Sequence, residues 1–172
     1  MYMDNFESLR LNYRQLTIDD SELIINWRNS PRLKNVSHKQ QEFNLEDHRK
    51  WFIKTRNNRN DFIFSEINTN KPIGMISLEN KKYNELPESC YELSKFIGDI
   101  NFSGKGFAFE ATSTVLNYFV SIKNIDFIFA LTRKDNYPNI KLNEKVGFAI
   151  EELPYYIKRN PDNWIYMKMK IK

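Results

Sequence analysis

Two glycines, Gly104 and Gly106, lie in a short segment, residues 101–108, between a run typical of a strand and a run typical of a helix. Glycine lacks a side chain, so such a turn lets the phosphate of a ligand approach backbone N–H groups closely. The first turn of a helix leaves those N–H groups unpaired and adds the positive end of the helix dipole. The spacing predicts a turn that binds an anion, although a Gly-x-Gly sequence before a helix is often only a turn.

The rest of the chain supplies the elements that must hold this turn in place. Alternating or continuous apolar runs predict strands at residues 9–16, 61–67, 71–79, 91–98, 126–132, 148–151 and 164–171. Helical spacing and capping residues predict helices that begin at Thr17, Asn44, the glycine segment and Pro138, with a polar loop between the first two. This order indicates an α/β (α+β) fold in one domain, residues 1–172, with a mixed, mostly antiparallel central sheet of about seven strands flanked by about four helices.

The composition excludes several classes of function. The net charge of +4 comes from basic residues scattered among 22 acidic ones, and no nucleic-acid motif or basic stripe is present. Cys90 is the single cysteine, so neither an internal disulfide nor a cysteine-based metal site is expected, and no metal is predicted. No apolar run is long enough to span a bilayer. We expect a cytoplasmic protein without nucleic-acid or membrane partners, whose mild positive charge favours anionic ligands.

Residues 136–148 form a second motif, Asn-Tyr-Pro-Asn-Ile-Lys-Leu-Asn-Glu-Lys-Val-Gly-Phe, downstream of the glycine segment. Together the two motifs resemble the signatures of the GNAT (GCN5-related) N-acetyltransferase family, Gln/Arg-x-x-Gly-x-Gly/Ala and a later segment ending in Glu-Lys-x-Gly-Phe. The matching positions are Asn101, Gly104, Gly106, Asn136, Glu144, Lys145, Gly147 and Phe148. The resemblance extends over essentially the whole chain. It implies the GNAT fold and transfer of the acetyl group of acetyl-CoA to a primary amine.

The resemblance also implies where acetyl-CoA is held. The implied contacts involve Phe96, Ile97, Gly98, Asn101, Phe102, Ser103, Gly104, Lys105, Gly106, Phe107, Ala108, Asn136 and Asn139. Backbone amides of residues 102–107 would hold the pyrophosphate, and the strand ending at residues 96–98 would splay from its neighbour and pair with pantetheine. Asn136 would hydrogen-bond the pantetheine arm, and the helix that begins at Pro138 would flank it.

Acetyl transfer needs a deprotonated amine, orientation, help for the oxyanion and a proton for the departing thiolate. The family's usual acid is a tyrosine at the position of Asn143, whose amide can hydrogen-bond sulfur but cannot act as an acid. Tyr137 or water could replace it. For the base, the resemblance favours Glu79, acting through water, with Ser94, Glu92 and His48 as alternatives. A glutamate at a strand end is also often only a solvated surface residue.

The N-terminal third indicates the acceptor. The segments Trp-Arg-Asn at residues 27–29 and His-x-x-Trp-Phe at residues 48–52 are similar to those of bacterial amino-sugar N-acetyltransferases, such as the pseudaminic-acid pathway enzymes. The implied acceptor residues are Trp27, Arg28, Asn29, His48 and Trp51. Arg28 could pair with a diphosphate and a tryptophan could stack on a base or sugar. Equally, both tryptophans could be core residues and Arg28 could cap a helix.

Three other interpretations remain open at this stage. A ribosomal-protein or peptide N-terminal acetyltransferase, or a polyamine acetyltransferase, would share these motifs. A polyamine site needs clustered carboxylates, and the candidates are Glu42, Glu46 and Asp47. The asparagine at position 143 also fits a CoA-binding module without catalytic activity. A homodimer formed through the strand at residues 164–171 is a further possibility.

Overall fold

The computed structural model describes residues 5–37 and 42–171, and its centre is one eight-stranded sheet with the order β1-β2-β3-β4-β5-β6-β8-β7. The strands are β1 (Phe6–Glu7), β2 (Leu11–Gln15), β3 (Arg59–Glu66), β4 (Pro72–Tyr83), β5 (Leu86–Ile97), β6 (Phe127–Arg133), β7 (Ala149–Glu151) and β8 (Trp164–Lys170). The α-helices are α1 (Ser21–Arg28), α2 (Pro31–Val36), α3 (Leu45–Thr55), α4 (Phe107–Ile122) and α5 (Tyr137–Lys145).

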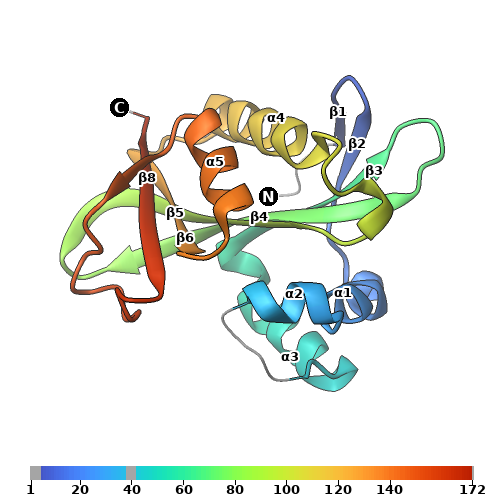
Figure 1. The fold of residues 1–172 in the computed structure, drawn as a ribbon, viewed down its shortest axis with the longest axis horizontal. Helices are drawn as coiled ribbons and strands as arrows, with labels where there is room; N and C mark the ends of the chain where they lie inside the picture. Colours follow the sequence, from blue (N-terminus) through green and yellow to red (C-terminus); the bar gives the residue numbers. More distant parts are fainter. Residues whose placement is uncertain (1–4, 38–41, 172) are drawn as a thin grey trace.

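The helices cover both faces of this sheet. Figure 1 shows α4 and α5 on one face and α1, α2 and α3 on the other, called here the α4–α5 face and the α1–α3 face. Period-two alternation along β3 explains the division, because Phe62 and Phe64 pack in the cluster that includes α4, whereas Ile63 packs with Ile24 of α1. The predicted mixed, mostly antiparallel sheet is confirmed.

One pair of strands is parallel, and it separates partway along. β5 and β6 pair at Cys90, Tyr91 and Glu92, opposite Phe127, Ile128 and Phe129, and the pairing stops there. Beyond Glu92, β5 stays paired with β4 as far as Ile97, while β6 continues beside β8 to Arg133. The predicted splaying of this strand is therefore present. We call the opening between residues 93–97 of β5 and residues 130–133 of β6 the fork.

The capping signals lie at the starts of the helices that they predict, and after Thr17 a 3₁₀ turn, Ile18–Asp20, leads into α1. Asn44 accepts a hydrogen bond from the backbone N–H of Asp47 at 2.8 Å at the start of α3. Asp20 accepts hydrogen bonds from the backbone N–H and the hydroxyl of Thr17, before α1. Asn136 precedes α5, which has its proline in the first turn. Each local signal satisfies N–H groups that a helix start would otherwise leave unpaired.

Two elements differ from the expectation. The predicted polar loop after α1 contains the short helix α2, which begins at Pro31 because proline's fixed φ suits a first helical position. The last part of that predicted loop, residues 38–41, lies outside the described residues. β1 adds an eighth strand of two residues, too short to give a periodic pattern. In addition, β7 pairs with β8 at residues 166–168, so a second copy could not pair with β8 there.

Candidate active site

The glycine turn, residues 103–106, has the geometry of an anion-binding loop. Gly104 and Gly106 have φ angles of 74° and 82°, in the left-handed region that favours glycine. A Cβ atom at Gly104 would meet nothing within 4 Å, so the turn is open to a ligand. Gly106 precedes α4 without a side-chain cap, and the first helical bond runs from Glu110 N–H to the Gly106 carbonyl. The N–H groups of residues 107–109 therefore have no intrahelical acceptor.

One ion pair and one hydrogen bond, both from Arg10, hold this turn and place a cation beside it. Glu110 accepts from Arg10 at 2.6 Å, and a second nitrogen of Arg10 donates to the Lys105 carbonyl at 3.1 Å. Burial acts to raise the pKa of Glu110, but hydrogen bonds from Ser8 and Arg10 outweigh it and leave that pKa lowered. Lys105 itself is exposed. A ligand that carries phosphate groups fits these unpaired N–H groups and cations.

The fork lies directly before the glycine turn in the chain, since β5 ends at Ile97 and α4 begins at Phe107. The end of β5 is fixed from the α1–α3 face. Arg32 of α2 donates to the carbonyls of Ile97 and Gly98 at 2.6 and 3.1 Å. The ring of Trp27 covers Gly98 so closely that a Cβ atom there would overlap it. Gly98 thus serves the packing of Trp27, and its predicted contact with a cofactor stays a prediction.

Asn143 lies inside the protein at the fork, with its side chain fully buried. Its Nδ2 group donates to Thr132 Oγ1 of β6 at 3.3 Å and approaches Met167 Sδ at 3.5 Å. Its Oδ1 atom accepts a hydrogen bond from Lys95 Nζ of β5 at 2.5 Å. Asn139 donates to the same Thr132 hydroxyl at 3.0 Å. The predicted residues Asn139 and Asn143 are therefore brought together, within one polar network.

Lys95 is the residue of this network that the sequence motifs do not include. Burial of its ammonium group lowers the pKa of Lys95 to about 7. The strand pattern contains a signal for it, because Tyr91, Leu93 and Ile97 share its face of β5 and pack in the core. A lysine in the apolar register of a strand is unusual and marks a position with a special role.

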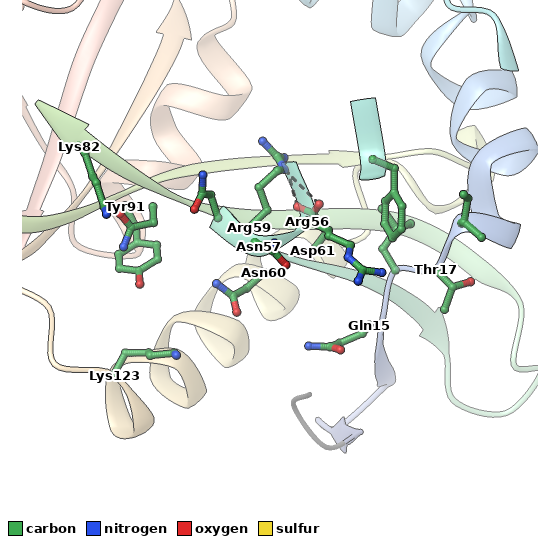
Figure 2. A pocket seen from close by; sticks show the side chains of 15 residues that line it. Gln15, Thr17, Arg56, Asn57, Arg59, Asn60, Asp61, Lys82, Tyr91 and Lys123 are labelled. Carbon is green, nitrogen blue, oxygen red and sulfur yellow. Dashed lines mark hydrogen bonds and ion pairs between the residues drawn. The ribbon is translucent and has the colours of Figure 1, made fainter. Parts of the chain in front are cut away.

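The α1–α3 face carries a charged network around Glu79. Arg59 pairs with Glu79 at 2.5 Å and with Asp61 at 3.1 Å, and Figure 2 shows the contact between Arg59 and Asp61. Lys81 pairs with the other oxygen of Glu79 at 2.7 Å and with Glu92 at 3.1 Å. Glu79 and Glu92 are opposite each other in the β4–β5 register, at the level where the fork begins. Both carboxylate oxygens of Glu79 are thus already engaged.

Ser94 lies one step further into the fork on this face. It is exposed, and its register partner on β4 is Ser77, which is buried. The Ser77 hydroxyl donates to Asp61 and accepts from Arg59 at 2.5 Å. Ser94 is therefore the member of this serine pair that a ligand can reach.

The predicted acceptor residues of α1 and α3 gather above this network. The guanidinium of Arg59 lies 4.9 Å from the ring centre of Trp51, and the His48 and Trp51 rings are 5.3 Å apart. His48 is 5% exposed, and neither ring nitrogen has a hydrogen-bond partner among the described residues. Burial lowers the pKa of His48, and nearby Arg28 lowers it further. His48 is therefore neutral at pH 7.

Arg28 and Asn29 have different surroundings. The Arg28 guanidinium lies over the Phe43 ring at 4.5 Å and forms no ion pair among the described residues. Its pKa is lowered by burial and by Arg59. Asn29 exchanges two hydrogen bonds with the backbone of Phe43, at 2.8 and 2.9 Å, so its amide holds the chain before α3. Arg28 is therefore the predicted acceptor residue whose charge has no ion-pair partner in the described part of the chain.

A separate hollow of about 640 Å³ lies at the other end of α4, near Lys123. Figure 2 shows Arg56, Arg59, Lys82 and Lys123 around it, and Asp61 is its one carboxylate. None of the predicted site residues lines it. Within residues 5–37 and 42–171, no helix could cross a membrane, and no group of three or more His, Cys, Asp or Glu side chains could hold a metal.

A family model described as acetyltransferase (GNAT) domain matches residues 10–149. A protein of uncharacterised function from Methanocaldococcus jannaschii is 30% identical over 93% of this chain, and the chain spans 31% of the length of that relative.

Two solved structures are similar in fold. A ribosomal-protein-S5-alanine acetyltransferase from Vibrio fischeri has a TM-score of 0.78 and 21% identity, over 98% of this chain and 97% of the other. A spermidine N-acetyltransferase from Vibrio cholerae, in complex with CoA and spermine, has a TM-score of 0.79 and 20% identity, over 95% of this chain and 96% of the other.

Proposed function

Because the chain belongs to the acetyltransferase (GNAT) domain family, we propose that it transfers the acetyl group of acetyl-CoA to a primary amine by direct attack. The acceptor that we propose is a nucleotide-linked amino sugar. One observation carries the first part: the fork of β5 and β6 leads directly into an uncapped, glycine-bearing start of α4. Acetyl-CoA requires both features side by side: the fork for its extended thioester arm, and the start of α4 for its diphosphate.

The chain's own residues would hold acetyl-CoA as follows. The free N–H groups at the start of α4 would bind the pyrophosphate, with Lys105 and Arg10 adding positive charge. Backbone groups of residues 93–97, released from β6, would pair with the pantetheine arm. The Asn136 side-chain oxygen caps α5, which leaves its Nδ2 group to donate to the same arm. Bound acetyl-CoA supplies the thioester carbonyl that the amine attacks.

The base that we propose is Glu79, with Glu92 and His48 as alternatives. Since Arg59 and Lys81 engage both oxygens of Glu79, its proton transfer would pass through a water molecule. The exposed hydroxyl of Ser94 lies between this network and the fork, where it would orient the amine.

The charges of the α1–α3 face support an anionic acceptor. Asp61, Glu79 and Glu92 are all paired, with Arg59 or Lys81. Glu42 and Glu46 pair with Lys34 and Lys50, at 3.9 and 2.6 Å. A polyamine would therefore meet few free carboxylates here, whereas Arg28 lacks a carboxylate partner among the described residues and can bind a diphosphate. The nearby Trp51 ring is covered by Arg59, so stacking on it would require that side chain to move.

The experiment measures CoA release with a UDP-linked amino sugar, spermidine and short peptides as acceptors. We expect turnover on the sugar, and Arg28→Ala should raise its KM more than it lowers kcat. The matched control is Arg56→Ala, an exposed arginine that lines the separate hollow. Robust turnover of peptides or spermidine with none on the sugar would contradict the acceptor. Binding of acetyl-CoA without turnover of any amine would favour the noncatalytic module.

A further inference from the structure

We propose that Lys95 donates the proton to the departing CoA thiolate, and that Asn143 positions its ammonium group. This inference rests on the proposed acetyltransferase activity. It supplies the general acid that Asn143 cannot be, because an amide at that position has no acidic proton to give.

Geometry places the ammonium group at the fork. Lys95 is in the middle of the β5 segment that has left β6, and its Nζ atom reaches Asn143 of α5 at 2.5 Å. Asn143 in turn donates to Thr132 of β6 at 3.3 Å. The lysine side chain therefore extends toward the same polar network that borders the fork on the β6 side. Only a group in this region could reach a thioester that occupies the fork.

The Asn143 amide can face the ammonium group only with its oxygen atom. Its Nδ2 group is committed to Thr132 and Met167, which leaves Oδ1 to accept from Lys95. An ammonium group has three donors, and the other two have no acceptor among the described residues. The Lys95 side chain is partly exposed, so a ligand in the fork can reach these two remaining N–H groups.

The surroundings of Lys95 contain no compensating charge. Its register partner on β4 is Ile76, and the adjoining network offers Thr132 of β6, Met167 of β8 and Asn143 of α5, none of which ionises near neutral pH. Lys95 forms no ion pair with any described carboxylate, and desolvation alone lowers its pKa, to about 7. A lysine with this pKa can both give and regain a proton at neutral pH.

The proton transfers balance without any further reactant. The nitrogen lone pair of the neutral acceptor amine forms a bond to the thioester carbon, and the carbon–sulfur bond then breaks, with its electron pair on sulfur. Lys95 Nζ gives one proton to that sulfur, which leaves as the thiol, and Lys95 becomes a neutral amine. The acceptor nitrogen loses one proton through water to the proposed base, Glu79, as it becomes an amide; Glu79 then releases that proton to solvent, and Lys95 regains one from solvent. One thioester and one amine give one amide and one thiol.

The test combines two variants with a readout that needs no turnover. Lys95→Met removes the charge, and Lys95→Arg keeps a charge that cannot be given up in the assay range. Lys141→Met, an exposed lysine on α5, is the matched control. The first readout is the ultraviolet absorbance of the thiolate of protein-bound CoA, titrated against pH. The second is kcat against pH, measured with the acceptor that is turned over in the CoA-release assay.

In the CoA complex the thiolate and the Lys95 ammonium group would stabilise each other, which raises the Lys95 pKa there, so we expect at least about a tenfold larger thiolate fraction of bound CoA in the wild type than in Lys95→Met at a pH where this pair forms. With a turned-over acceptor, kcat of Lys95→Met should fall about a hundredfold, with KM for acetyl-CoA nearly unchanged. The wild-type kcat should decline above a pH close to the Lys95 pKa of about 7, because only the protonated form donates. Lys95→Arg should restore the thiolate fraction but not kcat.

The outcomes separate this inference from the proposed function. Equal thiolate titration in wild type and Lys95→Met would overturn the inference even if acetyl transfer is confirmed. Full recovery of kcat by Lys95→Arg would also overturn it, by showing that a fixed charge suffices. Acetylation of Lys95 itself, detected by mass spectrometry, would show a nucleophile instead of a donor. If no amine is turned over, the proposed function fails, while a thiolate fraction that depends on Lys95 would still place its ammonium group beside sulfur.

Discussion

Replacing Lys95 by methionine should stabilise the protein near neutral pH. The pKa of Lys95 falls from its ordinary 10.5 to about 7. Each pKa unit corresponds to about 1.4 kcal/mol, so keeping this cation buried costs up to about 5 kcal/mol at or below pH 7. Lys95 is partly exposed, and the variant leaves Asn143 Oδ1 without its donor, at a cost of about 1–3 kcal/mol. We expect a net gain of about 1–3 kcal/mol, measured by urea unfolding.

The direction in which the stability gain of Lys95→Met changes with pH distinguishes relief of the desolvation cost from a gain that comes only from better packing. Because the folded-state pKa is depressed, the unfolded wild type binds more protons between pH 7 and 10.5, and its stability rises with pH in that window. The advantage of Lys95→Met should therefore be complete below pH 7 and shrink as the pH rises toward 10. Lys141→Met, which changes an exposed lysine, should show no such trend. A variant that is less stable than the wild type at pH 6.5, or a gain that is the same at pH 6.5 and 9.5, would refute the reasoning.

Changes at three other positions test the site. Glu79→Gln should lower kcat more than about tenfold with little change in the KM for acetyl-CoA, and an unchanged kcat would exclude Glu79 as the base. Gly104→Ala should cost about 1 kcal/mol in the left-handed turn but keep the thermal shift of several degrees that acetyl-CoA produces, whereas Gly104→Glu should lose that shift. Equal thermal shifts in the Gly104→Ala and Gly104→Glu variants would show that the glycine turn does not bind CoA. Gly98→Ala, whose Cβ atom would overlap Trp27, should destabilise the fold by about 1–3 kcal/mol in urea unfolding, and an unchanged midpoint would show that the ring can move aside.

Local signals in the sequence predicted most of the helices and strands, because the interactions behind these signals join residues that are close in the chain. The cap at Asn44 acts within α3, and the proline of α5 acts within its first turn. The glycine turn is equally local, since its positive φ angles depend on two residues. The helix α2 begins at Pro31 inside the stretch that was predicted to be a polar loop, because proline marks both a helix stop and a first helical position.

The fork and its lysine could not be placed in the same way. Where β5 leaves β6 depends on the register of a parallel pair separated by α4, which no local pattern specifies. The contact between Lys95 and Asn143 joins residues 48 positions apart and exists only once α5 covers the fork. The alternation of β5 gave a sufficient hint, because it placed a lysine between Leu93 and Ile97 on the core face.

The two faces of the sheet differ in how their charges are paired, and this difference separates their proposed tasks. On the α1–α3 face, Arg59 and Lys81 hold the carboxylates in ion pairs, which fix the positions of their side chains. On the α4–α5 face, Lys95 has only the neutral amide of Asn143 as a partner among the described residues, so its protonation changes near pH 7. Paired charges suit recognition and orientation of an acceptor, whereas an unpaired, desolvated amine suits proton transfer. We therefore assign the departing thiolate to the α4–α5 face and the incoming amine to the other.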